Sequence, residues 1–574
     1  MDKKEAAEIL EEIGVLLELK GENPFKTRAY ENAARTLLAQ PGDLDTLVET
    51  TGLKGIKGIG EGIRERIIEL HETGGSGYYE ELKASIPAGL VEILRIPGMG
   101  PKKAKAVYDS LSIGSIGELE YACNENRLID LPGFGAKTQE KILAGIQFLK
   151  KHAGQYLYAF ALAESEKLIR PIADSPKVIR ATVAGSIRRR KETTKDIDLL
   201  ASSGDPAAVM ELFTKLPEVE TVVSKGETKS SVALASGIAA DLRVVTDKEY
   251  PYALHHFTGS KLHNTAMRGR AKKMDMKMNE YGLYRGKAGK LVPCADEAEI
   301  FRALGLAFIP PELREDMGEI EAAEKGELPA LVEETDIKGV LHVHSRYSDG
   351  QDTVEELGLA CMKLGYSYLG LTDHSPAAAY AGGLREKELA AQQAEVDEFN
   401  RAHKAFRIFK GAEVDILPDG GLDYPEGVLA GFDFTVCSIH SKFGMTEDEA
   451  TRRLVKAIEH PRCTILGHPT GRLLLAREGY PVNMKKVIEA AAANGVAIEL
   501  NAHPIRLDID WREIRYAKGL GVKIAINPDA HNLGGLNDVR YGVGIARKGW
   551  LGKADVLNAM GLAEFEGWLK GRRK

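Results

Sequence analysis

The sequence has few cysteines, no long hydrophobic run and no excess of positive charge. Its five cysteines are scattered through 574 residues without a CxxC pair, which argues against a disulfide framework and a cysteine zinc site. No apolar run approaches the roughly 18 residues of a membrane span, and the first residues, MDKKE, lack the apolar core of a signal peptide. We therefore expect a protein of the reducing cytoplasm that does not contact a membrane.

Length and charge set further limits. A chain of 574 residues is too long for one hydrophobic core, and roughly three to five domains are expected. The net charge of −7 does not favour nucleic-acid binding by itself, but local basic clusters matter more than the total. The sequence therefore indicates a multidomain globular protein whose function depends on local motifs.

The most informative stretch is GSIRRRKETTKDIDLL, residues 185–200. Asp196 and Asp198 alternate with apolar residues, as on a β-strand, so both carboxylates share one face. Adjacent carboxylates repel each other unless a divalent cation lies between them, and Mg²⁺ or Mn²⁺ suits such oxygen ligands. Gly185 and Ser186 form a small-residue turn ahead of a basic run. Together these features suit a nucleoside triphosphate.

A later apolar run contains a third carboxylate. Asp241 lies within residues 240–245, a pattern that favours a strand. A carboxylate in a core strand costs several kcal/mol unless it is paired or metal-bound. We therefore expect Asp241 to complete a two-metal site that serves an incoming nucleotide and a primer 3′-oxygen.

Residues 1–150 repeat one pattern at residues 53–70, 94–111 and 128–149: an apolar residue, a turn with two glycines, and a helix carrying Lys or Arg. The first glycine allows a tight turn, and the second lets a phosphate approach the backbone and the following helix N-terminus. One such pair is more often a plain helix–helix turn, but three resemble helix-hairpin-helix motifs, which bind the DNA backbone without reading sequence. The residues assigned to this contact are Gly58, Gly60, Gly98, Gly100, Gly133, Gly135, Lys102 and Lys103.

With the D-x-R of the second strand and the FTGS of residues 257–260, this arrangement resembles a family X DNA polymerase of the polymerase beta type. The resemblance implies an α/β nucleotidyltransferase palm and a thumb, with Asp196, Asp198 and Asp241 as catalytic metal ligands. The nucleotide contacts that it implies are Gly185, Ser186, Arg189, Phe257, Gly259, Asn264 and Arg268. Another nucleotidyltransferase, such as an antibiotic-modifying enzyme, is disfavoured by the glycine hairpins and the thumb motif.

Three residues depart from the family pattern. His256 stands where the family usually has an aromatic residue before the Phe, which bears on discrimination against ribonucleotides. Ala239 stands where the beta enzyme has an arginine near the primer. Arg66 occupies the place of the lyase lysine; because arginine stays protonated and cannot form a Schiff base, we expect no beta-type lyase reaction through it.

Short β-rich runs alternate with helical patterns after an acidic segment at residues 317–335 that suits a linker. The strands are expected at residues 337–343, 368–372, 406–414, 434–438, 464–467, 497–500 and 523–526. This alternation predicts a parallel α/β barrel whose site lies at the carboxyl ends of the strands. Histidines and carboxylates recur at those ends, and their number favours zinc, manganese or iron over isolated structural histidines.

The pattern resembles a PHP (polymerase and histidinol phosphatase) domain, a distorted α/β barrel whose family site binds three metal ions. By position, the resemblance assigns His342, His344, Glu413 and Asp529 to the first ion; Glu413, His440 and His468 to the second; and Asp349, His374 and His531 to the third. Such a cluster hydrolyses phosphodiesters. Weaker candidates for phosphate contacts are Arg385, Lys442, Arg472 and Arg506.

These resemblances cover nearly the whole chain, in the order of bacterial and archaeal-type family X polymerases. The expected domains are 1–85 (lyase-like, helix-hairpin-helix), 86–150 (fingers, helix-hairpin-helix), 151–246 (palm), 247–316 (thumb), 317–335 (linker) and 336–574 (PHP). The implied function is gap-filling DNA synthesis in base-excision or end-joining repair, with a metal-dependent 3′→5′ exonuclease and an abasic-site endonuclease or 3′-phosphatase in the PHP domain.

The partners implied are gapped or primed DNA and dNTPs, and a monomer is expected. Two alternatives remain open at this point. The first is a phosphatase of a small metabolite with a relic N-terminal half, which the intact palm carboxylates disfavour. The second is a non-catalytic DNA scaffold, which would predict degraded metal positions.

Overall fold

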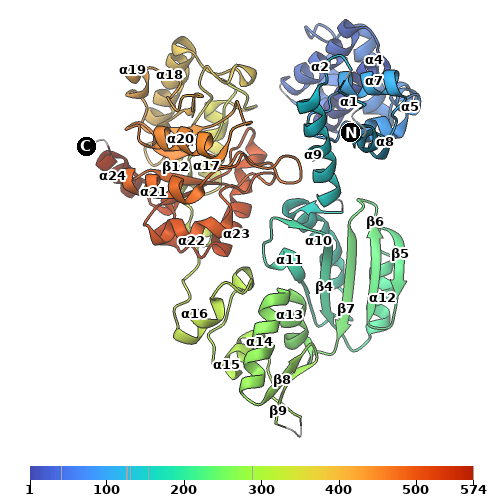
Figure 1. Cartoon of the computed structure of the whole chain (residues 1–574), viewed down its shortest axis with the longest axis vertical. Coiled ribbons are helices and arrows are strands. Elements are labelled where there is room, and N and C mark those ends of the chain that lie inside the picture. The colour runs from blue at the N-terminus through green and yellow to red at the C-terminus, as the bar shows by residue number, and fades with distance from the viewer. Residues whose placement is uncertain (41, 125–126, 130, 153, 287–288, 573–574) are drawn as a thin grey trace. The chain divides into compact units, whose positions relative to one another are not determined.

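The computed structural model (Figure 1) describes residues 1–574 except 41, 125–126, 130, 153, 287–288 and 573–574. Asp130, in the third glycine hairpin, is therefore outside the described residues. The chain divides into two compact units, Met1–Ala153 and Gly154–Lys574. Within the described residues, no helix combines the length and the apolar character that crossing a membrane requires.

The first unit is helical. Its helices are α1 (Lys3–Lys20), α2 (Pro24–Leu38), α3 (Leu44–Thr51), α4 (Glu61–Thr73), α5 (Gly77–Ala84), α6 (Ala88–Ile93), α7 (Pro101–Leu111), α8 (Ile116–Asn124) and α9 (Ala136–His152). Helix α1 begins at a capping box between Asp2 and Glu5 and ends at Gly21, whose φ of +78° suits glycine. Its buried stripe of Leu10, Ile13 and Leu17 is central to one apolar cluster that also contains residues of the glycine hairpins.

The second unit begins with a five-stranded sheet that corresponds to the expected palm. Its elements are β1 (Tyr156–Leu157), α10 (Tyr158–Ala173), β2 (Arg180–Val183), α11 (Gly185–Arg188), β3 (Thr193–Thr194), β4 (Asp196–Ser202), α12 (Pro206–Thr214), β5 (Val219–Lys225), β6 (Lys229–Leu234) and β7 (Ala239–Val245). The strand order is β2-β4-β7-β6-β5, with β4 and β7 parallel and the other pairs antiparallel.

Successive side chains of strand β4 point to opposite faces of the sheet. Ile197, Leu199 and Ala201 are buried in the apolar cluster that also holds the buried side chains of α10 and α12. Asp196 and Asp198 alternate with them and therefore lie on the opposite face of the sheet. This alternation places the two carboxylates outside the core formed by the sheet and the two helices.

The thumb region combines helices with a small antiparallel sheet of order β10-β9-β8. Its elements are α13 (Tyr250–Thr258), α14 (Lys261–Lys273), β8 (Met276–Asn279), β9 (Gly282–Arg285), β10 (Lys290–Leu291), α15 (Glu297–Ala303), η1 (Pro311–Leu313) and α16 (Glu319–Lys325). Helix α16 lies in the segment 317–335 that the sequence suggested as a linker. Ile320 is buried in the thumb cluster with Phe301, and Glu319 is buried against His263. Residues 319–325 are thus part of the thumb core, because apolar burial and the buried hydrogen bond between His263 and Glu319 hold them there.

The remaining residues form the barrel. Its elements are η2 (Glu334–Asp336), β11 (Gly339–Val340), α17 (Val354–Lys363), β12 (Tyr368–Leu371), η3 (Ala379–Ala381), α18 (Glu386–Ala402), β13 (Arg407–Lys410), β14 (Glu413–Asp415), α19 (Glu426–Leu429), β15 (Val436–Ser438), α20 (Glu447–Ile458), β16 (Ile465–Leu466), α21 (Met484–Asn494), β17 (Ala497–Asn501), α22 (Trp511–Gly519), β18 (Ile524–Asn527), η4 (Leu533–Asp538), α23 (Val539–Lys548), η5 (Lys553–Asp555), η6 (Leu557–Ala559) and α24 (Leu562–Arg572).

All paired barrel strands are parallel, in two runs of order β11-β12-β13 and β14-β15-β16-β17-β18. The parallel bridges His374–Glu413 and Val343–Ala530 join the two runs into a ring. Phe565 of α24 is buried with side chains that begin the strands, such as Tyr368. The fold is the multidomain α/β arrangement that the sequence predicts, and the distorted barrel is confirmed.

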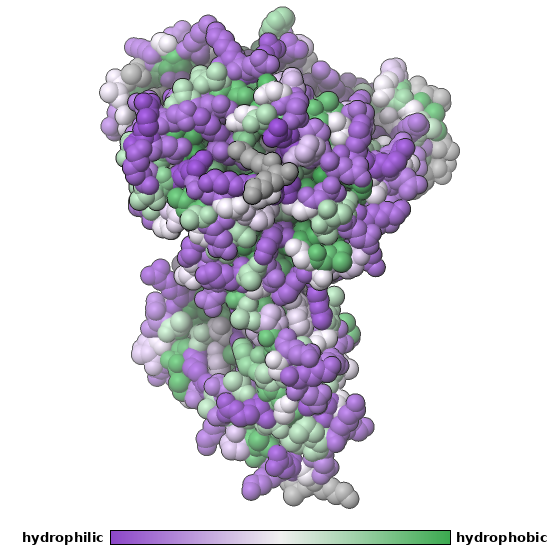
Figure 2. Space-filling view, turned by 90° about the vertical axis from the view of Figure 1, so that its left-hand side faces the viewer, coloured by the Kyte–Doolittle hydropathy of each residue, from purple (hydrophilic) through white to green (hydrophobic). Residues whose placement is uncertain are grey.

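The face of the molecule in Figure 2 is covered mainly by hydrophilic side chains. Apolar residues on that face occur in small, scattered areas, as on most protein surfaces exposed to water.

Candidate active sites

The three palm carboxylates meet on neighbouring strands. Asp198 of β4 lies directly opposite Asp241 of the parallel strand β7, and Asp196 lies two residues before Asp198 on the same face. Burial and the negative charges of Asp196 and Asp241 raise the pKa of Asp198 to about 6. Lys229 places its Nζ 2.6 Å from Asp241 Oδ2 and offsets part of this negative charge. Three carboxylates that repel one another at one point form a donor set suited to hard divalent cations.

The turn before these strands allows only glycine at its first position. Gly185 has a φ of +60°, and a Cβ there would lie 2.0 Å from Asp198 Oδ2. Ser186 is the second residue of the short helix α11, and its Oγ lies 2.5 Å from Thr194 Oγ1. Arg189 follows that helix and donates from Nε to Glu315 Oε1 at 3.0 Å. The backbone turn therefore lies directly beside the carboxylates, as a triphosphate site would require.

The thumb residues assigned to the nucleotide and template lie on α13 and α14. Asn264 donates from Nδ2 to the His256 carbonyl at 2.7 Å, and Arg268 Nη2 lies 3.0 Å from His256 Nδ1. Phe257 stacks under the Arg243 guanidinium at 4.8 Å from the ring centre. Gly259 has a φ of +70°. The structure thus groups Asn264, Arg268 and Phe257 around His256, whereas Gly259 lies beside Arg189. Ala239 lies opposite Asp196 in the register of β7 and β4.

The glycine hairpins share one turn geometry. Gly58, Gly98 and Gly133 have φ values of +100°, +87° and +83°. The residue between each pair of glycines donates its N–H to the carbonyl three residues earlier, at 3.2, 2.9 and 3.0 Å. Nothing among the described residues lies within 4 Å of a Cβ built on the second glycines, Gly60, Gly100 and Gly135. Their backbone is therefore open to a large ligand such as a phosphate.

Two lysines were assigned to the second hairpin. Lys103 donates from Nζ to the Gly98 carbonyl at 3.2 Å, so it supports the turn itself. Lys102 is exposed, with Glu18 Oε1 at 3.8 Å from its Nζ. Arg66, at the lyase position of the first hairpin, contacts Glu69 at 3.2 Å and stacks 4.8 Å from the Tyr78 ring centre.

In the barrel, Glu413 is the centre of a cluster of imidazoles. Its Oε1 lies 2.9 Å from His468 Nε2 and 3.1 Å from His440 Nε2, and its Oε2 lies 3.0 Å from His374 Nδ1. The Nε2 atoms of His342 and His344 lie 3.4 and 3.6 Å from the same Oε2. Glu413 and four of these histidines are buried, and His440 is half-buried, so one carboxylate contacts five histidines that are largely shielded from bulk water.

The other assigned ligands adjoin this cluster. Asp529 Oδ1 lies 3.4 Å from His342 Nε2 and 3.2 Å from His344 Nε2. Asp349 Oδ2 lies 3.3 Å from His531 Nε2 and 3.5 Å from His374 Nε2. Three groups of side chains bring their ligand atoms within 4.8 Å of one another: His342, His344 and Asp529; His374, Glu413 and His440; and His344, Asp349, His374 and His531.

The buried nitrogens fit a metal cluster. Among the described residues, neither ring nitrogen of His344 nor Nε2 of His342 has a hydrogen-bond partner, which is costly in a buried site unless a cation binds there. Burial and His374 lower the pKa of His344 to about 4, so its imidazole is neutral and able to bind a metal. Although burial lowers the pKa of His440, Glu413 raises it to about 10. The negative charge of Glu413 therefore favours a positive charge beside it, either a proton or a metal ion.

Glu499 is a buried residue behind the ligands that the sequence analysis did not identify. Its Oε1 lies 2.6 Å from His342 Nδ1, and its Oε2 accepts the backbone N–H of His468 at 2.8 Å. Asn501 donates to Glu499 at 3.1 Å and to Asp529 at 3.0 Å. Glu499 lies in the apolar strand β17, so the rule that singled out Asp241, a carboxylate in an apolar strand, applies to it equally.

The four weaker candidates for phosphate contacts differ in their surroundings. Arg472 is committed to Asp510 at 2.8 Å and to the Arg506 carbonyl at 2.9 Å, so it holds the loop after β17. Arg506 Nε lies 3.4 Å from Asp529 Oδ2, beside the cluster. Lys442 and Arg385 are exposed. Of the four candidates, Arg506 is the one for which an ion pair with a proposed metal ligand is found among the described residues.

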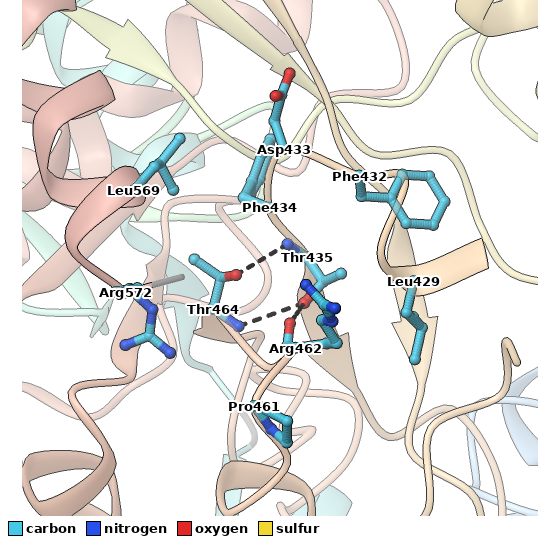
Figure 3. A pocket seen from close by; sticks show the side chains of 10 residues that line it. All are labelled: Leu429, Phe432, Asp433, Phe434, Thr435, Pro461, Arg462, Thr464, Leu569 and Arg572. Atoms are coloured by element: carbon cyan, nitrogen blue, oxygen red, sulfur yellow. Dashed lines mark hydrogen bonds between the residues drawn. The ribbon is translucent and has the colours of Figure 1, made fainter. Parts of the chain in front are cut away.

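A cavity of about 230 Å³ lies in the barrel but away from the histidines (Figure 3). It is lined by Thr435 and Thr464, which precede β15 and β16, and by Arg572 of α24. His440 and His468 follow the same two strands, so the cavity is at the amino ends and the histidines are at the carboxyl ends. No assigned ligand lines this cavity.

Comparison with known families covers most of the chain. The matches are helix-hairpin-helix domain (residues 1–76), SAM-like helix-hairpin-helix tandem (residues 90–147), DNA polymerase beta thumb (residues 253–315) and PHP domain (residues 341–503). These matches agree with the helical first unit, the thumb region and the barrel.

Curated proteins extend the similarity to the full length. The protein named DNA polymerase/3′-5′ exonuclease PolX of Bacillus subtilis (strain 168) is 39% identical over 572 residues, 99% of this chain and 100% of that protein. A protein named "Probable phosphatase" of Thermoanaerobacter sp. (strain X514) is 30% identical over 211 residues, 34% of this chain and 80% of its own. Another of that name, of Acetivibrio thermocellus, is 30% identical over 199 residues, 33% of this chain and 78% of its own. The chain therefore belongs to the PolX family of DNA polymerases, family X enzymes with helix-hairpin-helix domains, a polymerase beta thumb and a C-terminal PHP domain.

Proposed function

We propose that this enzyme fills gaps during DNA repair and trims 3′ ends in its PHP domain. Family membership makes it a DNA polymerase with a 3′-5′ exonuclease. The observation that supports the proposal is that the proposed ligands of each site lie together. The palm carboxylates stand side by side on β4 and β7, and the nine barrel ligands adjoin one another around Glu413, Asp529 and Asp349. The degraded metal positions expected of a DNA scaffold are not found among the described residues.

In the palm, Asp196, Asp198 and Asp241 would hold Mg²⁺ or Mn²⁺. These ions, when bound, stabilise negative charge at the primer 3′-oxygen and the triphosphate. Because the pKa of Asp198 is about 6, its carboxylate is largely ionised at neutral pH and available as a ligand. Ser186 and Arg189 would orient the triphosphate beside these carboxylates.

In the barrel, the nine ligand side chains would hold up to three Zn²⁺, Mn²⁺ or Fe²⁺ ions, which supply Lewis acidity for phosphodiester hydrolysis when bound. Glu499 accepts from His342 Nδ1, which leaves Nε2 with its lone pair toward the cluster. Arg506 places positive charge beside Asp529, where an anionic phosphate would be attracted. These residues orient ligands and substrate around the site.

The test uses one labelled gapped duplex with Mn²⁺, with and without dNTPs. The variant Asp196→Asn/Asp198→Asn should lose synthesis and keep hydrolysis, because its barrel is unchanged. The variant His342→Ala/His344→Ala should lose hydrolysis and keep synthesis. Exonuclease activity that survived the histidine changes would refute the assignment of hydrolysis to the barrel.

A second activity of the barrel is favoured by its relatives. Proteins named "Probable phosphatase" match about a third of this chain, so removal of a 3′-phosphate from a blocked primer is proposed as well, along with cleavage at abasic sites. A primer ending in 3′-phosphate should be extended by the wild type and not by His342→Ala/His344→Ala. Extension by both would exclude the phosphatase.

Gapped or primed DNA and dNTPs are the proposed substrates, and the working form is proposed to be a monomer in the cytoplasm, where bacterial and archaeal DNA resides. Sedimentation in the presence and absence of gapped DNA would test the monomer. A dimer at working concentrations would contradict this part of the proposal.

A further inference from the structure

Helix α23 of the barrel packs under the basic loop that follows α11 of the palm. Lys548, its last residue, is fully buried although it carries an amine. Its Nζ lies 2.5 Å from Glu315 Oε1, 3.2 Å from the Arg189 carbonyl and 3.4 Å from the Glu312 carbonyl. The amine also lies 4.6 Å from the ring centre of Trp511. The side chain of Lys548, which belongs to the barrel, is thus buried against residues of the palm and the thumb.

Glu315 is shared between two cations. The oxygen that contacts Lys548 also accepts Nε of Arg189 at 3.0 Å, and the side chains of both Glu315 and Arg189 are largely buried. Arg189 in turn donates from Nη1 to the carbonyl of Thr258, the residue before Gly259. One continuous set of contacts therefore runs from the barrel through Glu315 and Arg189 to the thumb turn.

Neighbouring contacts hold the same loop on the barrel. A Cβ on Gly544 of α23 would lie 3.1 Å from Cδ of Arg190, so the two segments touch. Arg190 donates to the Tyr158 hydroxyl, and the Tyr158 ring packs edge-on against Tyr541 at 5.9 Å. The loop therefore contacts α23 both at Arg189, through Lys548, and at Arg190.

The charges decide what Lys548 contributes. With Lys548 in place, Glu315 is shared by two cations and the three side chains carry a net charge of +1, which remains available to a triphosphate. Without Lys548, the negative charge of Glu315 would be balanced by Arg189 only. Because this carboxylate is largely buried, its ion pair with the guanidinium would compete with binding of a phosphate. Removal of the amine should therefore weaken the attraction of Arg189 for an anionic ligand.

We propose that Lys548 is a positioning residue for DNA synthesis. Through Glu315 it holds the Arg189 side chain in place, and by sharing the negative charge of Glu315 it leaves the positive charge of Arg189 available to the nucleoside triphosphate. The PHP domain is then a structural part of the polymerase site, independent of its own hydrolysis. This inference rests on the proposed role of Arg189 in nucleotide binding.

The test measures KM for dNTP and kcat of gap filling for Lys548→Met, which keeps the length of the side chain and removes its charge. We expect KM to rise about tenfold, as typical coupling between contacting charges implies, with kcat and exonuclease activity within about twofold. Lys548→Arg, which keeps the charge, should restore most of the affinity. The matched control is Arg547→Met on the same helix, which breaks the 2.7 Å contact with Glu312 but touches neither Glu315 nor Arg189.

A double-mutant cycle separates this role from a general structural one. In an Arg189→Met background, Lys548→Met should raise KM no further, because its effect passes through Arg189. An equal and additive rise in that background, or a rise no larger than that of Arg547→Met, would overturn the inference. If Arg189→Met itself left KM unchanged, the proposed role of Arg189 would be wrong instead.

Exonuclease activity of each preparation reports whether the chain has folded. Should Lys548→Met lose that activity too, Lys548→Gln takes its place under the same criteria, because a neutral amide can still satisfy the buried carbonyl groups.

Discussion

The buried carboxylate of Glu499 offers a sharp test of the barrel site, because it contacts two proposed metal-ligand residues without being a proposed ligand itself. Glu499→Gln keeps the shape and removes the charge. Its contact with His342 Nδ1 is 2.6 Å long and fully buried. A hydrogen bond to a charged group contributes about 1.5–3 kcal/mol, which corresponds to a factor of roughly 10–100 in affinity. The usual loss on removing a partner behind a metal ligand is also about 10–100-fold.

The expected result is therefore a drop of about 10–100-fold in metal affinity and in exonuclease activity, with gap filling unchanged. Metal affinity is measured by removing bound metal with a chelator, titrating the metal-free protein with Mn²⁺ and following its thermal unfolding. Glu566→Gln is the control, since it removes the Arg407 ion pair in the barrel and contacts no proposed ligand. If Glu499→Gln bound Mn²⁺ and degraded DNA within twofold of the wild type, the reasoning from buried partners would be refuted.

Three further predictions concern the palm and the first unit. The pKa of Asp198, about 6, lies above its ordinary value of 3.8, so protonation stabilises the metal-free fold at low pH and this contribution is lost as the pH rises through about 6. Asp198→Asn should therefore raise the Tm of EDTA-treated protein at pH 7, by about 1 °C for each kcal/mol of repulsion relieved in a unit as large as Gly154–Lys574, and change it little near pH 4. A lower Tm at pH 7 would contradict the repulsion. Lys102→Ala should weaken DNA binding about equally for all sequences and reduce the slope of log K against log salt by about 1, whereas an unchanged slope would remove Lys102 from the interface. Borohydride trapping on an abasic substrate should give no adduct at Arg66, and a mapped adduct at that residue would disprove its exclusion as a lyase nucleophile.

Local patterns predict most of the barrel and most of the residues that the structure brings together in the two proposed sites. Strand ends are marked by an apolar run followed by His or Asp, and the structure has a strand within or overlapping every expected range. The sequence singles out Asp198 and Asp241 because a carboxylate is conspicuous between apolar neighbours. Glu499 carries the same signal and was missed because its strand ends in Asn501 and lacks a histidine or aspartate that would mark it.

Other features depend on tertiary contacts that no local pattern encodes. The acidic segment at residues 317–335 resembles a linker, yet Ile320 and Glu319 are buried because the thumb core offers them an apolar cluster and His263. Lys548 meets Glu315 across 233 residues of sequence. An exposed lysine and a buried one look alike in sequence, so this contact could be found only in three dimensions.

The alternation along β4 has a consequence for how the palm folds. A strand shifted by one residue against β7 would turn Asp196 and Asp198 into the apolar layer packed on α10 and α12, and Ile197 and Leu199 onto the face that now carries the carboxylates. Such a misaligned sheet would bury two carboxylates and lose its core, so it would not persist as a compact state. The same register that buries the apolar side chains of β4 therefore also places the carboxylates opposite each other. A palm that reaches its native stability already has Asp198 aligned with Asp241.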